Sequence, residues 1–175
     1  MSTAVELRPS SNEYAPYYDK YVTRVGAGDI VAILHEQLEI TLELLRSIPE
    51  SKADFRYAEG KWSIKEIVGH ITDAERVFSH RAFRFGRGDK TPLPTFDHDS
   101  YVVEGKFELL SLSELANEFE EVRRATISLL SHFSAETWNR IGTASDAEVS
   151  VRALAYITAG HELHHVDILR ERYLS

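Results

Sequence analysis

Residues 61–81 read KWSIKEIVGHITDAERVFSHR and contain the clearest helix signal in the chain. Ser63 and Glu66 have the spacing of a capping box, in which each side chain accepts a hydrogen bond from a free backbone N–H group at the start of a helix. Apolar residues then recur at intervals of three and four, as on one face of an α-helix. These residues are Ile67, Val68, Ile71, Ala74, Phe78 and Ala82. The stretch therefore predicts a helix that begins after Ser63, ends near Gly86 or Gly88 and buries one face.

Three further segments repeat apolar residues at helical spacing, and each follows a residue that suits the start of a helix. They span residues 29–48, about 111–132 and about 150–173, and a short helical turn is expected at 134–139. Each of the four long helices has to bury an apolar face against the others. The expected fold is therefore all-α, a four-helix bundle.

The connection between the second and third predicted helices is long, covering roughly residues 88–107. Such a crossover can return the chain from one end of a bundle to the other, so that neighbouring helices run parallel. Residues 1–28 contain Pro9, Pro16 and several tyrosines without a sustained helical period, and they predict an arm packed across the bundle. The length favours one domain over residues 1–175.

The composition excludes several classes of protein. The net charge is −8 and the basic residues are interleaved with acidic ones, which disfavours nucleic acid as a partner. The longest nearly apolar stretch, residues 153–160, is far below the ~20 residues that span a bilayer, and no secretory leader opens the sequence. We therefore expect a cytoplasmic protein without membrane contact. There is no cysteine, so a transition metal would need nitrogen and oxygen ligands.

Three histidines are predicted to meet inside the bundle. His161 and His165 lie one turn and ~40° apart on one face of the last helix, which they share with Leu154 and Ile157. His70 lies beside the buried stripe of the helix within residues 61–86. Three imidazoles with an open coordination position are a ligand set for a catalytic divalent metal. The alternative is a group of surface or hydrogen-bonded core histidines.

The sequence HELHH at 161–165 also fits the HExxH motif of zinc peptidases, in which the glutamate is the general base. Those enzymes take a third ligand downstream, whereas position 171 is a glutamate and the sequence ends at Ser175. This context argues against a peptidase. Glu162 could still act as a base on water at the metal, or it could be an exposed helix residue.

The other candidate residues have open assignments. Asp73 could orient a ligand ring or be solvated. His164 could support a ligand from behind or simply pack, and packing is favoured. The remaining histidines have no companion at ligand spacing, and His98 falls in a loop between two aspartates. We expect exposed or singly hydrogen-bonded side chains for His35, His80 and His132.

Residues 61–81, with TPLPTFDHDSY at 91–101 and GHELHHVDIL at 160–169, resemble the DinB-like superfamily of metalloproteins, which includes YfiT-type proteins. The resemblance covers nearly the whole chain. It implies a four-helix bundle, often dimeric, with nickel or zinc at a histidine triad. The triad positions correspond here to His70, His161 and His165.

The resemblance implies an activity less clearly. Relatives include thiol S-transferases that use bacillithiol or mycothiol, a mycothiol-dependent maleylpyruvate isomerase, and candidate hydrolases. Our leading hypothesis is an enzyme that activates a low-molecular-weight thiol, or a water, for attack on a small-molecule electrophile. A noncatalytic, stress-related metal-binding or scaffold protein is the second hypothesis. A metal-dependent hydrolase with Glu162 as the base is the third.

Overall fold

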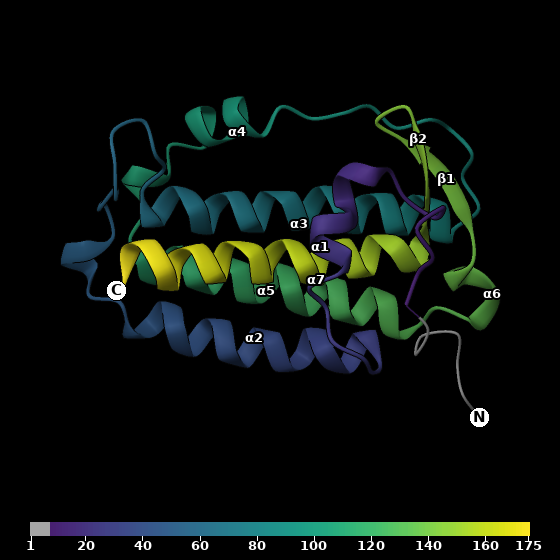
Figure 1. Cartoon of the computed structure of the whole chain (residues 1–175), viewed down its shortest axis with the longest axis horizontal. Coiled ribbons are helices and arrows are strands. Elements are labelled where there is room, and N and C mark those ends of the chain that lie inside the picture. The colour runs from purple at the N-terminus through teal and green to yellow at the C-terminus, as the bar shows by residue number, and fades with distance from the viewer. Residues whose placement is uncertain (1–7) are drawn as a thin grey trace.

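The computed structural model describes residues 8–175, and its main body is the predicted four-helix bundle (Figure 1). The four long helices are α2 (Ile30–Ser47), α3 (Ile64–Gly86), α5 (Leu112–Ser131) and α7 (Val151–Ile168). Helices α3 and α5 run in one direction and α2 and α7 in the other (Figure 1). The long crossover therefore joins two parallel neighbours, as predicted.

Local capping chemistry sets the starts of these helices. The Ser63 side chain accepts a hydrogen bond from the Glu66 backbone, and the Glu66 carboxylate accepts one from the Ser63 backbone, so the predicted capping box is present. Ser111 and Glu114 form a second capping box at the start of α5. Asp29 caps α2 through hydrogen bonds from two backbone N–H groups.

Short elements complete the helical part of the chain. The expected turn at 134–139 is helix α6 (Ala135–Trp138). Beyond α7, residues Leu169–Tyr173 continue as a π-helical turn, so the last helical segment reaches Tyr173 as predicted.

The crossover contains a helix that the sequence analysis missed. Helix α4 (His98–Gly105) is capped by the Asp97 side chain and is followed by a 3₁₀ turn, Phe107–Leu109. Only Val102 of α4 is buried, so the helix lacks the apolar stripe by which the longer helices are recognised.

The segment between the expected turn at 134–139 and the last helix forms a β-hairpin, which the sequence analysis did not predict. Strands β1 (Ile141–Ala144) and β2 (Ala147–Ser150) pair antiparallel, with Ile141 opposite Ser150. The two-residue turn, Ser145 and Asp146, has positive φ at both positions, as a tight hairpin requires. The segment lacks the Asn-Gly or Asp-Gly signal that usually marks such turns.

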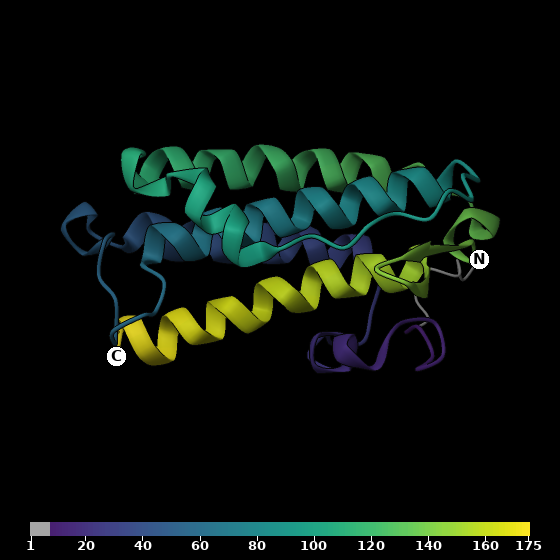
Figure 2. The ribbon, with the colours of Figure 1, turned by 90° about the horizontal axis from the view of Figure 1, so that it is seen from above.

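The described part of the N-terminal arm, residues 8–28, packs beside α7 (Figure 2). Residues 1–7 of the predicted arm lie outside the described part. The arm contains a 3₁₀ turn (Pro16–Tyr18) and helix α1 (Asp19–Val22), which the sequence analysis did not predict. A Cβ atom on Gly160 would lie 2.0 Å from the backbone oxygen of Tyr21. Only glycine therefore permits this close approach of α1 to α7.

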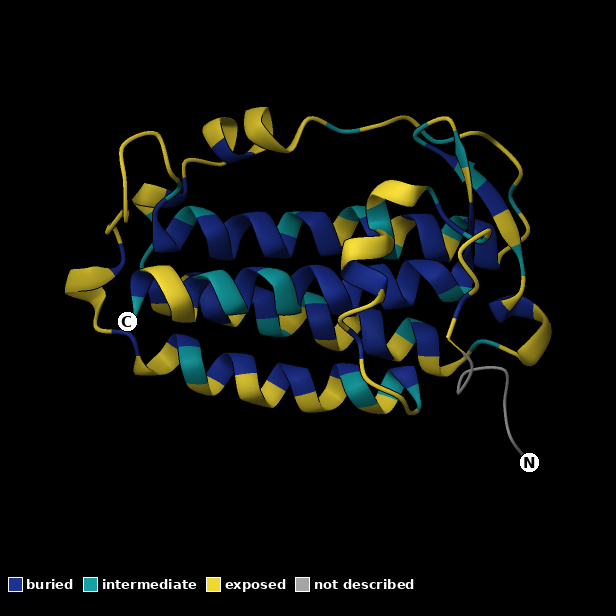
Figure 3. Ribbon diagram, viewed as in Figure 1, coloured by how far each residue is buried: buried dark blue, intermediate teal, exposed yellow. Residues whose placement is uncertain are grey.

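The bundle core consists of two apolar clusters, one toward each end, and the buried faces of the helices point inward (Figure 3). Along α3, the first cluster includes Phe78 and the second Ile67; along α5, they include Ile127 and Phe119. Some buried polar residues lie between the two clusters along their helices, namely Gln37, Arg123 and Glu162. Among the described residues, no helix is both long and apolar enough to cross a membrane.

Candidate metal centre

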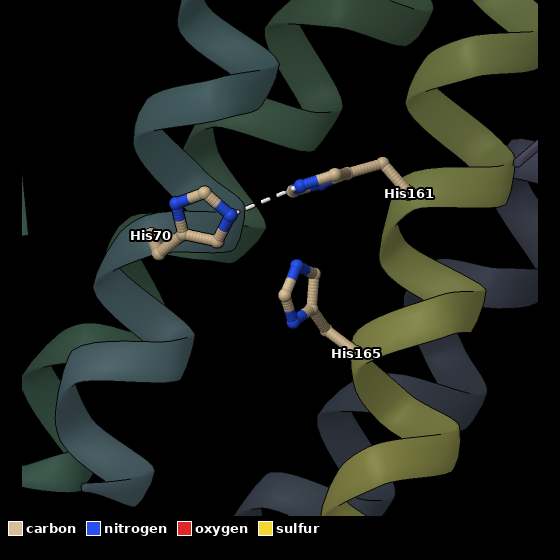
Figure 4. A group of neighbouring side chains, drawn as sticks. All are labelled: His70, His161 and His165. Carbon is tan, nitrogen blue, oxygen red and sulfur yellow. Dashed lines mark hydrogen bonds between the residues drawn. The ribbon is translucent and has the colours of Figure 1, made fainter. Parts of the chain in front are cut away.

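The structure brings the three predicted histidines together between α3 and α7. His70 extends from α3 toward His161 and His165, which lie one turn apart on α7 (Figure 4). The Nε2 atoms of His70 and His161 are 3.0 Å apart. One ring nitrogen from each histidine lies within 4.8 Å of the others. We refer to these residues as the histidine trio.

Burial keeps the trio uncharged. All three residues are buried, and desolvation is the main cause of their lowered pKa values, followed by the repulsion of neighbouring histidines. The pKa falls to about 4 for His70 and to about 2 for His165, and that of His161 lies well below its ordinary value. Three imidazoles that resist protonation offer three lone pairs at neutral pH.

The donor set and its spacing fit a divalent metal. Zinc binds imidazole nitrogen at ~2.0–2.1 Å, so two ligands of a tetrahedral site lie ~3.3 Å apart. The separation between His70 and His161 is close to that value. Three nitrogen ligands leave a further position for an exogenous ligand. His70, His161 and His165 are the residues that would hold the ion.

A cavity of about 480 Å³ adjoins all three histidines. Its other side chains are mostly aromatic, so we call it the aromatic cavity, and the aromatic ones come from four separate parts of the chain. The aromatic residues are Tyr17, Tyr18, Tyr21, Trp62, Phe78 and Phe96. This volume lies within the range of small-molecule sites, ~300–1,000 Å³.

Contacts between distant segments hold the walls of the aromatic cavity in place. The crossover pairs with the hairpin, since the Leu93 N–H donates to the Thr143 carbonyl and the Ser145 N–H donates to the Leu93 carbonyl. Arg81 donates to the Pro94 carbonyl at 2.9 Å and to the Ser145 hydroxyl at 3.0 Å. These bonds hold the crossover residues beside the cavity, where they can limit the access of water.

His98 lines the aromatic cavity, although the sequence analysis set it aside as a loop residue. Its ring centroid lies 5.6 Å from that of His70 and 6.1 Å from that of Trp62. Sequence spacing could not indicate this position, because His98 reaches the site only through the path of the crossover.

Glu162 is buried, so the expectation of an exposed helix residue is wrong. Its Oε1 accepts a hydrogen bond from the Thr41 hydroxyl at 2.6 Å, and its Oε2 lies 2.7 Å from Nη2 of Arg123. Arg123 also binds both carboxylate oxygens of Glu75. We refer to Thr41, Glu75, Arg123 and Glu162 as the ionic cluster. Burial raises the pKa of Glu162, while the charge of Arg123 opposes this rise.

The sequence analysis missed Glu75 and Arg123, although a signal was available. Both occupy positions within apolar stripes, Glu75 between Ile71 and Phe78 and Arg123 four residues from both Phe119 and Ile127. Such a position predicts a charged side chain that points into the core and needs a partner there.

The other candidates lie outside the trio. Asp73 is half-buried and pairs with Arg76 at 3.1 Å. His164 is half-buried, with its ring 5.5 Å from that of Tyr21. As predicted, the remaining histidines are exposed: His35, His80 and His132.

Comparisons with known proteins agree with this architecture. The sequence profile described as the DinB superfamily matches residues 33–169. A protein of Oceanobacillus iheyensis, provisionally named a metal-dependent hydrolase, is 23% identical over 126 residues, which cover 71% of this chain and 72% of that protein.

Two solved structures share the fold. YfiT from Bacillus subtilis, provisionally described as a metal-dependent hydrolase with an unusual four-helix bundle topology, superposes with a TM-score of 0.65 at 15% identity. That match covers 94% of this chain and 93% of YfiT. A mycothiol-dependent maleylpyruvate isomerase superposes with a TM-score of 0.68 at 12% identity, over 83% of this chain and 62% of the isomerase.

Proposed function

This chain belongs to the DinB superfamily, and from this premise we propose that it is a metal-dependent enzyme that transfers a low-molecular-weight thiol to a small electrophile. The observation that carries the proposal is the convergence of three buried, neutral imidazoles beside a cavity large enough for a substrate. A purely structural metal site would instead be closed by a fourth protein ligand. Nickel and zinc are the proposed ions, since imidazole suits both.

The metal would supply positive charge that favours the deprotonated form of a thiol or water. The protein residues supply the rest. His70, His161 and His165 provide neutral ligands, and the aromatic walls exclude water and hold an apolar electrophile. Because the chain has no cysteine, the reacting sulfur has to come from a co-substrate.

Two features favour a thiol over water as the nucleophile. A free thiol has a pKa of ~8.5, so it needs a far smaller shift than water to ionise at neutral pH. Among the described residues, no carboxylate lines the aromatic cavity to serve as a base for water. In the proposed reaction the thiol proton goes to solvent and a sulfur lone pair forms the new C–S bond. The leaving group departs with the electron pair of the broken bond.

The experiment combines metal-loaded protein, 2-mercaptoethanol and 1-chloro-2,4-dinitrobenzene, and it follows the formation of the thioether and the release of chloride. We expect His161→Ala to lower the rate at least ~100-fold, because two imidazoles would hold the metal weakly. The exposed His132→Ala is the matched control and should react like the wild type. Equal turnover by His161→Ala and the wild type would end the proposal.

Hydrolysis is the second candidate, because two relatives have that provisional description. Glu162 would then have to act as the base, despite its contacts with Thr41 and Arg123. Glu162→Gln should abolish hydrolysis of an activated ester and leave the metal content unchanged. Retained hydrolysis would remove Glu162 from this role. If instead the metal only stabilises the bundle, its removal should lower the melting temperature while no thiol or substrate changes the metal spectrum.

A further inference from the structure

A second cavity, of about 270 Å³, shares two residues with the aromatic cavity. Trp62 and His165 line both, so the two cavities meet beside one member of the histidine trio. The second cavity extends from there toward the end of the last helical segment, where Tyr173 lines it. Of the histidine trio, His165 therefore borders both cavities.

Trp62 is held in place where the two cavities meet. Its ring centroid lies 4.7 Å from that of His70 and 6.5 Å from that of His165, on which it stacks at an interplanar angle of 30°. Its backbone carbonyl accepts a hydrogen bond of 2.6 Å from the Tyr173 hydroxyl. Trp62 thus forms a wall common to both cavities.

The two cavities differ in charge. Within residues 8–175, no aspartate, glutamate, lysine or arginine lines the aromatic cavity. The second cavity is lined by both Lys61 and Asp99. Among the described residues, Lys61 has no ion-pair partner, and Asp99 has only a contact of 3.9 Å with His98. Both side chains are exposed, and their opposite charges are complementary to the two ends of a small zwitterion.

We infer that the second cavity binds the polar end of the thiol co-substrate, and that this end is an α-amino-acid-like zwitterion. Its carboxylate pairs with Lys61 and its ammonium group with Asp99, while its sulfur reaches the histidine trio beside Trp62. The electrophile occupies the aromatic cavity. This inference rests on the proposed function and adds to it separate sites for two reactants that are bound at the same time.

The test uses cobalt-loaded protein and two thiols of similar chain length. Homocysteine has both charges, and 4-mercapto-1-butanol has neither. Binding is followed by calorimetry and by the sulfur-to-cobalt absorption band. We expect Lys61→Met and Asp99→Asn each to weaken the binding of homocysteine roughly 5–10-fold, and to leave that of 4-mercapto-1-butanol unchanged. Lys52→Met, an exposed lysine outside both cavities, is the control for net charge.

The outcomes separate the two proposals. If the variants bind both thiols as the wild type does, the second cavity is not the zwitterion site, and the proposed function stands. If neither thiol produces the absorption band in the wild type, thiol activation itself is wrong. Chelation of cobalt by homocysteine affects all variants equally, so the difference between variants reports on Lys61 and Asp99 alone.

Discussion

The histidine trio and the ionic cluster are two buried polar clusters with neighbouring residues on α7. They differ in what binds their polar groups. His161 and His165 point toward His70 and the aromatic cavity, whereas Glu162, the next residue after His161, contacts Arg123. Both clusters include residues from α3 and α7. One is completed by the protein itself and the other would be completed by an ion from outside.

The charged groups of the ionic cluster pair with one another. Arg123 is fully buried and donates to both oxygens of Glu75 at 2.8–3.0 Å. Its Nη2 atom also forms an ion pair with Oε2 of Glu162 at 2.7 Å. Thr41 donates to Glu162, so each of the four long helices contributes one residue. Buried charges are tolerated only with such partners, because each loses its hydration. The arrangement therefore ties the four helices together.

Within residues 8–175, the histidine trio has no charged side chain as a partner. Its members are neutral and converge on one point, where the only hydrogen-bond contact within the trio joins His70 to His161. Because the ionic cluster and the histidine trio are both buried, burial alone does not identify a functional site. The informative feature is a set of neutral nitrogen donors that converge on one point beside a cavity.

The largest effect is expected from breaking the ionic cluster. Arg123→Met would leave Glu75 and Glu162 buried without their cation, and it should lower the free energy of unfolding by ~3–5 kcal/mol. Urea denaturation measures this loss. Arg124→Met is the matched control, since Arg124 pairs with Glu120 at the surface and should change stability little. Similar denaturation midpoints for the two variants would contradict the structural role of the cluster.

The next effect concerns the histidine trio. His70→Ala should weaken metal binding by more than ~100-fold, or ~2.7 kcal/mol, because one of three ligands is lost. Without metal, His70→Ala should lower the free energy of unfolding by less than Arg123→Met does. Competition with a chelating dye measures the affinity, and His80→Ala, on the same helix but exposed, should bind metal like the wild type. If both histidine variants bind metal equally, His70 is not a ligand.

The smallest effect is a dependence of stability on pH. In the folded, metal-free protein the pKa of His70 is about 4, below the ordinary 6.5, so between these values the unfolded chain binds more protons. Stability is therefore complete above pH ~6.5 and falls as the pH drops toward 4. From pH 7 to pH 5, the wild type should lose about 2 kcal/mol more than His70→Ala. Urea denaturation at both pH values measures these losses. If the free energy of unfolding falls equally for the wild type and for His70→Ala, the pKa of folded His70 is not lowered.

The local features of the fold could be predicted from the sequence. The capping box at Ser63 and Glu66 and the apolar stripe that follows depend on residues within a few positions of each other. The spacing of His161 and His165 likewise places both rings on one side of a helix. Local spacing therefore predicted the bundle and the candidate ligands.

Only the tertiary structure decided what surrounds those candidate ligands. His70 and His161 are 91 residues apart, and Glu75 and Arg123 are 48 apart, so no local rule sets their distances. The same is true of His98, which the crossover brings beside His70. Helix formation depends on neighbours along the chain, whereas a cavity or an ionic cluster depends on how the helices pack, and packing is a property of the whole chain.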